Sequence, residues 1–133
     1  MKSDIEIKDD IYNFIKGSVL SVAVNGKLCK TGVRPKGSDK EDIVLSILAN
    51  ENGQIQEAVV NVNIYVKDDI TDDDQNQEAT IRLRVLCGIA EQVLSVGRGD
   101  DFRFKLASQR VLAVDEAKLH VINNKLIYKQ VNE

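Results

Sequence analysis

The segment QIQEAVVNVNIYVK, residues 54–67, alternates apolar and polar side chains along most of its length. Its apolar positions are Val60, Val62, Ile64 and Val66, and its polar positions are Asn61, Asn63, Tyr65 and Lys67. A period of two sends alternate side chains to opposite faces of a β-sheet, so the pattern predicts a long strand with its apolar face on a core. The polar face is left to contact water, a partner subunit or nucleic acid.

A first helix is predicted near the N-terminus. Ser3 or Asp4 can cap it, and Gly17 provides a stop. The apolar residues that recur between them at helical spacing are Ile7, Ile11, Phe14 and Ile15. We therefore expect a short amphipathic helix that packs on a flat surface.

Three more strands are predicted between this helix and residue 54. Asn25-Gly26 is typical of a type I′ hairpin turn, which would join strands at 18–24 and 27–34. Pro35 would end the second of these strands. The next strand, turn and strand are expected at 42–49, 50–53 and 55–67.

The C-terminal half predicts a second helix, at 78–96, followed by extended segments. The apolar stripe of the helix is Ile81, Val85, Ile89 and Val93, widened by Leu86 and Leu94. Gly97 and Gly99 are expected to end it. Extended segments are expected at 102–106, 110–115 and 118–129, the last folded at Asn123-Asn124.

These elements predict an α+β fold in a single domain, residues 1–133. The order is a helix, four strands, a helix, and two or three strands. Such an order favours a mostly antiparallel sheet with the two helices packed on one face. A chain of 133 residues and 14.8 kDa has enough apolar residues to form one core without disulfides or metals.

Charge and composition exclude several classes of function. The 18 basic and 21 acidic residues give a net charge of -3, so there is no overall basic field that would favour DNA binding as the main task. Two widely separated cysteines do not indicate a disulfide scaffold or a zinc site. There is no apolar run long enough for a membrane span, so we expect a soluble protein without membrane contact.

The sequence contains little that indicates an enzyme. His120 is the one histidine, and no serine or cysteine in a nucleophile motif accompanies it. Paired carboxylates are the remaining candidates for catalytic groups. A small metal-dependent nuclease using Glu41, Asp42 and the group 72–74 stays open as an alternative. We expect no enzymatic activity and no cofactor.

A pattern of short motifs resembles small tail proteins encoded by phages and prophages. The motifs are Gly32-Val33-Arg34-Pro35, Ser38, Glu41-Asp42-Ile43-Val44 and the strand 60–66. Among these proteins, the pattern most resembles the tail-completion or tail-terminator family. Head–tail joining proteins are related to this family. The order of elements also resembles that family through the closing strands 121–124 and 126–128, so the resemblance covers nearly the whole chain.

The resemblance implies a structural, non-enzymatic protein of the virion. Proteins of this family form homo-oligomeric rings, typically of six subunits, which stop growth of the tail tube and provide the docking surface for the head connector. Tail-tube and head-connector proteins would be the partners, and DNA would only pass through the lumen. The expected location is the virion, or the host cytoplasm before assembly.

The polar strand face and the acidic residues after it are the predicted oligomer interface or lumen. They are Asn61, Asn63, Tyr65, Lys67, Asp68, Asp69, Asp72, Asp73 and Asp74. Amide and hydroxyl groups can bond between identical copies without charge repulsion. Segment 68–77 is expected to become ordered only against a ring neighbour or the tail tube. A phage assembly chaperone or binding module, with the same polar face docked on another protein, remains an alternative.

Overall fold

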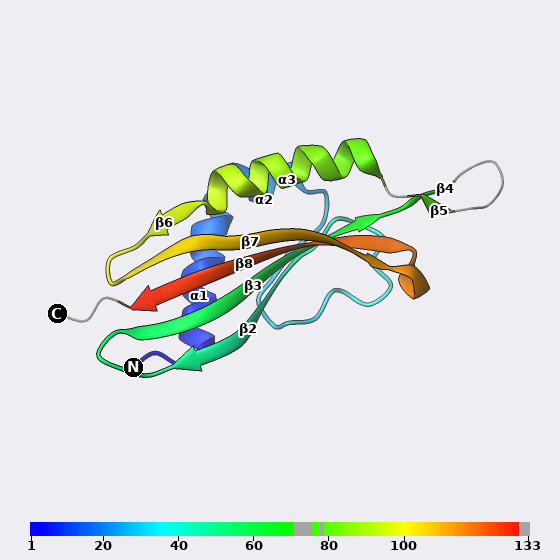
Figure 1. Cartoon of the computed structure of the whole chain (residues 1–133). Coiled ribbons are helices and arrows are strands. Elements are labelled where there is room, and N and C mark those ends of the chain that lie inside the picture. The colour runs from blue at the N-terminus through cyan, green and yellow to red at the C-terminus, as the bar shows by residue number, and fades with distance from the viewer. Residues whose placement is uncertain (71–75, 78, 131–133) are drawn as a thin grey trace.

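The computed structural model describes residues 1–70, 76–77 and 79–130, which form a curled six-stranded sheet with helices packed against it (Figure 1). The strand order is β1-β2-β3-β8-β7-β6. The strands are β1 Leu28–Cys29, β2 Ile43–Glu51, β3 Gln56–Lys67, β6 Val96–Arg98, β7 Phe102–Val114 and β8 Leu119–Gln130. Only β1 and β2 pair in parallel within this sheet. The α+β class and the mostly antiparallel sheet are confirmed.

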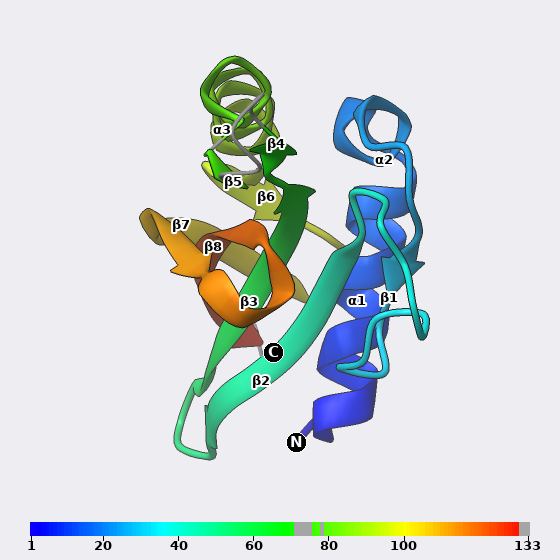
Figure 2. The ribbon, with the colours of Figure 1, turned by 90° about the vertical axis from the view of Figure 1, so that its right-hand side faces the viewer.

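The first helix, α1 (Asp4–Lys16), forms where the sequence predicts it. Ser3 and Glu6 form a capping box, in which each side chain accepts a hydrogen bond from the other residue's backbone N–H. Its core-facing residues Ile7, Ile11 and Ile15 are completely buried. Figure 2 shows α1 on one side of the sheet, close to β2.

The core lies between the sheet and the helices, and the strand at 56–67 supplies its centre. Val60, Val62 and Ile64 are completely buried and Val66 is 2% exposed, as the period-two pattern predicts. The matching residues on β2 and β8 include Leu45, opposite Val62, and Leu126, opposite Val60. These pairings set the faces of every strand in the sheet, because a shift of one residue would expose the whole apolar set.

The prediction of a hairpin at 18–34 is wrong. Residues 19–23 form a short helix, α2 (Val19–Ala23), which buries Leu20 and contacts α1 and α3 (Thr80–Leu94). A type I′ turn needs positive φ at both central residues, and neither Asn25 nor Gly26 has it. Gly26 is required for a different reason: a Cβ there would lie 2.3 Å from the carbonyl oxygen of Glu41.

The predicted buried stripe of the second helix is right for Leu86 and Leu94, which are completely buried, and wrong for its first residues. Ile81 is 80% exposed and Val85 46% exposed, while Ile89 and Val93 are only half-buried. The buried face consists of Leu83, Leu86, Ala90 and Leu94. Both sets of residues have helical spacing, so periodicity alone could not choose between them.

The ends of α3 and of the C-terminal strands differ from the prediction as well. The helix ends at Leu94, before Gly97 and Gly99. Both glycines instead make room for aromatic rings, since a Cβ on Gly97 would lie 2.1 Å from the Phe104 ring. The expected break at Asn123-Asn124 is absent from β8, which pairs with β7 in one long hairpin. Its turn includes the 3-10 segment Asp115–Ala117.

A separate pair of short strands, β4 (Asp69–Ile70) and β5 (Asn76–Gln77), follows β3. Residues 71–75, 78 and 131–133 lie outside the described part of the chain. Among the helices that are described, none combines the length and the apolar character needed to cross a membrane.

Candidate functional site

The polar positions of β3 belong to a continuous surface on the side of the sheet that faces away from the buried core, here called the outer sheet face. The register of the strands places residues of neighbouring strands directly beside these positions, on the same face of the sheet. Three such rows are Ser108–Lys125–Asn61–Ser46, Arg110–Asn123–Asn63–Val44 and Leu112–Val121–Tyr65. The outer sheet face is therefore built by β2, β3, β7 and β8 together, with β6 at its edge.

An amide cluster lies in the middle of this face. The Nδ2 atom of Asn123 donates hydrogen bonds to Asn63 Oδ1 at 2.7 Å and to Asn61 Oδ1 at 3.3 Å. All three side chains are half-buried. Within the described residues, the Nδ2 groups of Asn61 and Asn63 have no partner in the chain. They can donate to another molecule without disturbing the cluster.

Asn123 was missed by the sequence interpretation, which assigned it to a turn. The local pattern gave no clear signal, because apolar and polar residues do not alternate regularly around Asn123 and Asn124. The pairing of Asn123 with Asn63 is what places its side chain on the outer sheet face. Its neighbour Asn124 points the opposite way and is completely buried. There it donates to the Val62 carbonyl oxygen at 3.1 Å and accepts from Gln109 at 2.8 Å, which satisfies an otherwise costly buried amide.

Tyr65 and Lys67 extend the face toward the far end of β3. The Arg34 guanidinium lies over the Tyr65 ring at 4.6 Å from its centre. Arg34 is held in place by Asp42 and by the Lys40 carbonyl oxygen. Tyr65 therefore contacts the loop that follows β1, whereas Lys67 is exposed.

The acidic residues of the predicted interface fall into three situations. Asp68 is buried, and its Oδ1 atom lies 2.6 Å from Nδ1 of His120, so the pair ties the end of β3 to β8. Asp69 is exposed. Asp72, Asp73 and Asp74 lie outside the described residues.

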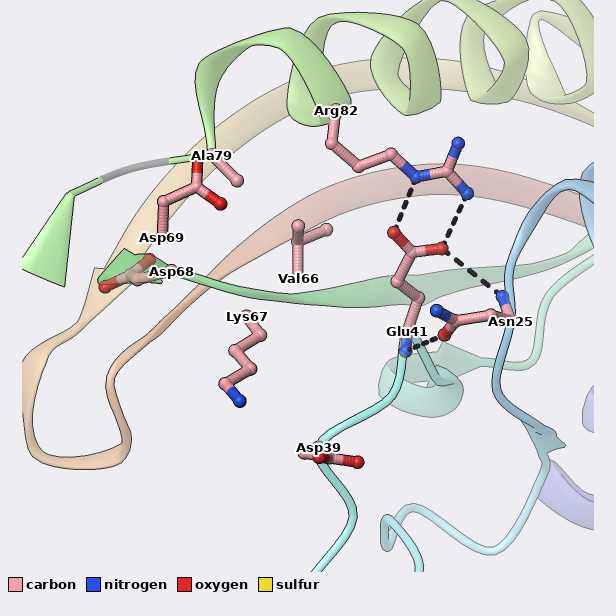
Figure 3. Close-up of a pocket in the computed structure, with 9 residues that line it drawn as sticks. All are labelled: Asn25, Asp39, Glu41, Val66, Lys67, Asp68, Asp69, Ala79 and Arg82. Atoms are coloured by element: carbon pink, nitrogen blue, oxygen red, sulfur yellow. Dashed lines mark hydrogen bonds and ion pairs between the residues drawn. The ribbon is translucent and has the colours of Figure 1, made fainter. Parts of the chain in front are cut away.

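A charged cavity of about 460 Å³ brings three of the predicted residues together with residues that the sequence did not connect to them (Figure 3). Its lining is Asn25, Asp39, Glu41, Val66, Lys67, Asp68, Asp69, Ala79 and Arg82. Figure 3 shows Arg82 reaching down from α3 to Glu41, with Asn25 beside them. The cavity thus lies where α3, the end of β3 and the loop before β2 meet.

The Glu41–Arg82 ion pair dominates this cavity. Arg82 donates from Nε to Oε2 at 2.6 Å and from Nη2 to Oε1 at 2.7 Å, a two-pronged geometry that is stronger than a single contact. Hydrogen bonding to Glu41 raises the pKa of the Arg82 guanidinium. The Nη2 atom also donates to the Ala23 carbonyl oxygen. This network joins α2, α3 and the loop before β2.

Asp42 is engaged in the same manner. It is 1% exposed and accepts hydrogen bonds from Ser38 Oγ at 2.6 Å, Lys27 N at 2.8 Å and Arg34 Nε at 3.0 Å. Burial alone would raise the pKa of this carboxyl group, but the three donors together lower it below the ordinary value. Within the part of the chain that the structure describes, no group of three or more His, Cys, Asp or Glu side chains could hold a metal ion.

The fold and surface define an α+β protein whose main sheet is mostly antiparallel, with helices packed against the buried face of this sheet and a polar outer sheet face. It is similar to a chain of a solved structure described as "Virion of native gene transfer agent (GTA) particle". The two share 12% sequence identity and a TM-score of 0.54, over 94% of this chain and 94% of the other. This likeness shows a shared fold. No family model matches the sequence. The curated proteins contain no match to it.

Proposed function

We propose that this chain is a structural, non-enzymatic assembly protein of a phage-type tail. It forms a homo-oligomeric ring that completes the tail tube and joins it to the head. Tail-tube and head-connector proteins are its partners, and the virion is its final location. The observation that carries the proposal is the shared fold, over nearly the full length of both chains, with a chain of a gene transfer agent virion.

Two surface features support self-assembly. The Asn61–Asn63–Asn123 cluster offers unpaired amide donors on the outer sheet face, where identical copies can hydrogen-bond without charge repulsion. Beyond Leu106, the outer edge of β7 has no partner strand among the described residues. Residues 110–114 on this edge are all exposed. An unpaired, partly apolar edge is a template for pairing with another chain.

The predicted interface residues remain part of this proposal, with different roles. Asn61, Asn63, Tyr65 and Lys67 face a neighbouring subunit or the lumen. Asp69 and segment 72–74 extend that contact. Asp68 contributes indirectly, because its carboxylate is already paired with His120.

The substitutions Asn61→Asp and Asn63→Asp together test the ring surface. We expect closed rings of the wild-type protein in negative-stain micrographs at high concentration and loss of those rings in the double variant. The reason is that two carboxylates would repel their counterparts in neighbouring copies. The fold should be retained, since the Asp oxygens can still accept from Asn123.

The matched control is Asn13→Asp with Asn52→Asp, two exposed asparagines away from this face. It should form rings like the wild type. Undiminished rings in the Asn61→Asp, Asn63→Asp variant would contradict the proposed surface. A one-to-one complex with a different protein, without rings, would favour the chaperone or binding-module alternative.

The nuclease alternative is disfavoured because its described carboxylates already bind other groups of the protein. Glu41 is held by Arg82, and Asp42 is held by three donors, so a metal would have to displace cations and hydrogen bonds at both. Magnesium- or manganese-dependent cleavage of DNA by the purified protein would reverse this conclusion.

A further inference from the structure

The outer sheet face is basic, although the chain as a whole is acidic. Besides Lys67 on β3, six of the 18 Lys and Arg residues lie on it, within three neighbouring strands. They are Arg98 on β6; Arg103, Lys105 and Arg110 on β7; and Lys125 and Lys129 on β8. The helices and loops therefore carry the excess of negative charge. Net charge conceals this separation, and only the strand register reveals it.

Three of these cations form a single cross-strand row. Arg98 pairs with Arg103, and Arg103 pairs with Lys129. Like charges directly opposite each other on a sheet are destabilising. The nearest acidic counterpart is Glu57, next along the row on β3, with its Oε2 atom 3.9 Å from Lys129 Nζ. In the described part of the chain, the other five cations on β6, β7 and β8 form no ion pair.

The neighbouring row, which contains Lys105, combines a charged side chain with apolar ones. Lys105 is level with Val96 on one side and Ile127 on the other. Together with Arg103 and Lys129 these residues line a shallow groove of about 330 Å³. The apolar floor supports the aliphatic stems of the long side chains, while Arg103 and Lys105 reach solvent.

The size and composition of the face fit a long polyanion. The cations extend from Arg103 to Arg110 along β7, which is roughly 20 Å of strand. A duplex of about that length carries about a dozen phosphates. Tyr65 is the one aromatic residue among the described positions of this face, so base stacking along a single strand has little support.

We propose that the outer sheet face over β6, β7 and β8 binds the phosphate backbone of duplex DNA without sequence specificity. The proposal deepens the proposed function and rests on it only for the place where DNA is met, the lumen of the ring. It changes the expectation for that lumen: DNA would be held by the face rather than pass without attraction.

Fluorescence anisotropy with a labelled 20-base-pair duplex of mixed sequence, titrated over a range of salt concentrations, tests the proposal. The wild-type protein should bind, with log K falling linearly as log salt rises. Arg103→Gln with Lys105→Gln should weaken binding roughly 10- to 100-fold at 0.1 M salt and reduce the slope by about two.

The control pair is Lys16→Gln with Arg84→Gln, which removes the same charges from exposed positions on α1 and α3. Binding should be unaffected by it. Equal weakening by both pairs, or no binding by the wild type at low salt, would overturn the proposal. Poly-glutamate that binds as tightly as the duplex and responds to the same variant would also overturn it, in favour of an acidic protein surface. Ring formation is scored separately by microscopy, so either proposal can fail alone.

Discussion

At the scale of single residues, Asp42 does most to connect the irregular N-terminal half to the sheet. Its carboxylate accepts hydrogen bonds from Lys27, just before β1, and from Arg34 and Ser38 in the loop after β1. The same interaction positions Arg34 over Tyr65 on the outer sheet face. One buried charge thus organises both the loop and part of the candidate interface.

Asp42→Asn is expected to lower the free energy of unfolding by roughly 2 to 4 kcal/mol at neutral pH, because it removes one partner of a buried charge pair. The pKa of Asp42 is lowered on folding, so its contribution is full above the ordinary Asp pKa and is lost as pH falls through the folded value. The difference between wild type and variant should therefore shrink in acid. Urea unfolding monitored by circular dichroism at pH 7 and pH 3 measures this difference.

The control is Asp39→Asn, at an exposed position of the same loop. It should change the free energy of unfolding by less than about 0.5 kcal/mol.

At the scale of elements, α3 shows how an ion pair can decide which face of a helix is buried. The helix carries two apolar stripes, and the one that begins at Ile81 is exposed at Ile81 and Val85. Arg82 binds Glu41 and the Ala23 carbonyl oxygen. With this contact in place, the helix buries Leu83 and Leu86.

Leu86→Ala and Ile81→Ala should therefore have unequal effects. Leu86 is completely buried, so its truncation should cost about 2 to 5 kcal/mol of unfolding free energy. Ile81 is 80% exposed, and its truncation should change stability by less than about 0.5 kcal/mol. Chemical denaturation of both variants under the same conditions makes the comparison. Similar losses in the two would show that α3 packs by its other stripe.

At the scale of the whole molecule, the two edges of the sheet differ in their capacity for assembly. Beyond Val44, where pairing with β1 ends, the free edge of β2 is interrupted by a register shift between Ile47 and Ala49. Such bulges discourage pairing with other chains. The β7 edge is regular beyond Ser108 and carries exposed apolar residues, including Val111 and Leu112. The β7 edge is therefore the better candidate for contact between subunits.

Leu112→Lys tests this edge. A lysine on an exposed edge strand opposes pairing with another chain, so rings should be lost while the monomer stays folded. Size-exclusion chromatography with light scattering at high concentration reports the oligomer, and thermal unfolding reports the fold. Lys118→Leu, in the hairpin turn beyond this strand, should have no such effect if pairing occurs along β7. Rings of normal abundance from Leu112→Lys would exclude the edge as an interface.

The sequence by itself determined the central strand with its two faces, α1 with its cap and the α+β class. These follow from local periodicity and capping chemistry, which depend only on residues that are close together in the sequence. Tertiary structure alone decided that 19–23 is helical, that Ile81 faces solvent, and that six cations share one sheet face. Each depends on which distant segments become neighbours: Arg82 with Glu41, Gly26 with the Glu41 backbone, and β6 with β7 and β8. Strand register and helix rotation are set by such long-range contacts, because two alternatives with equal local periodicity differ only in what they touch.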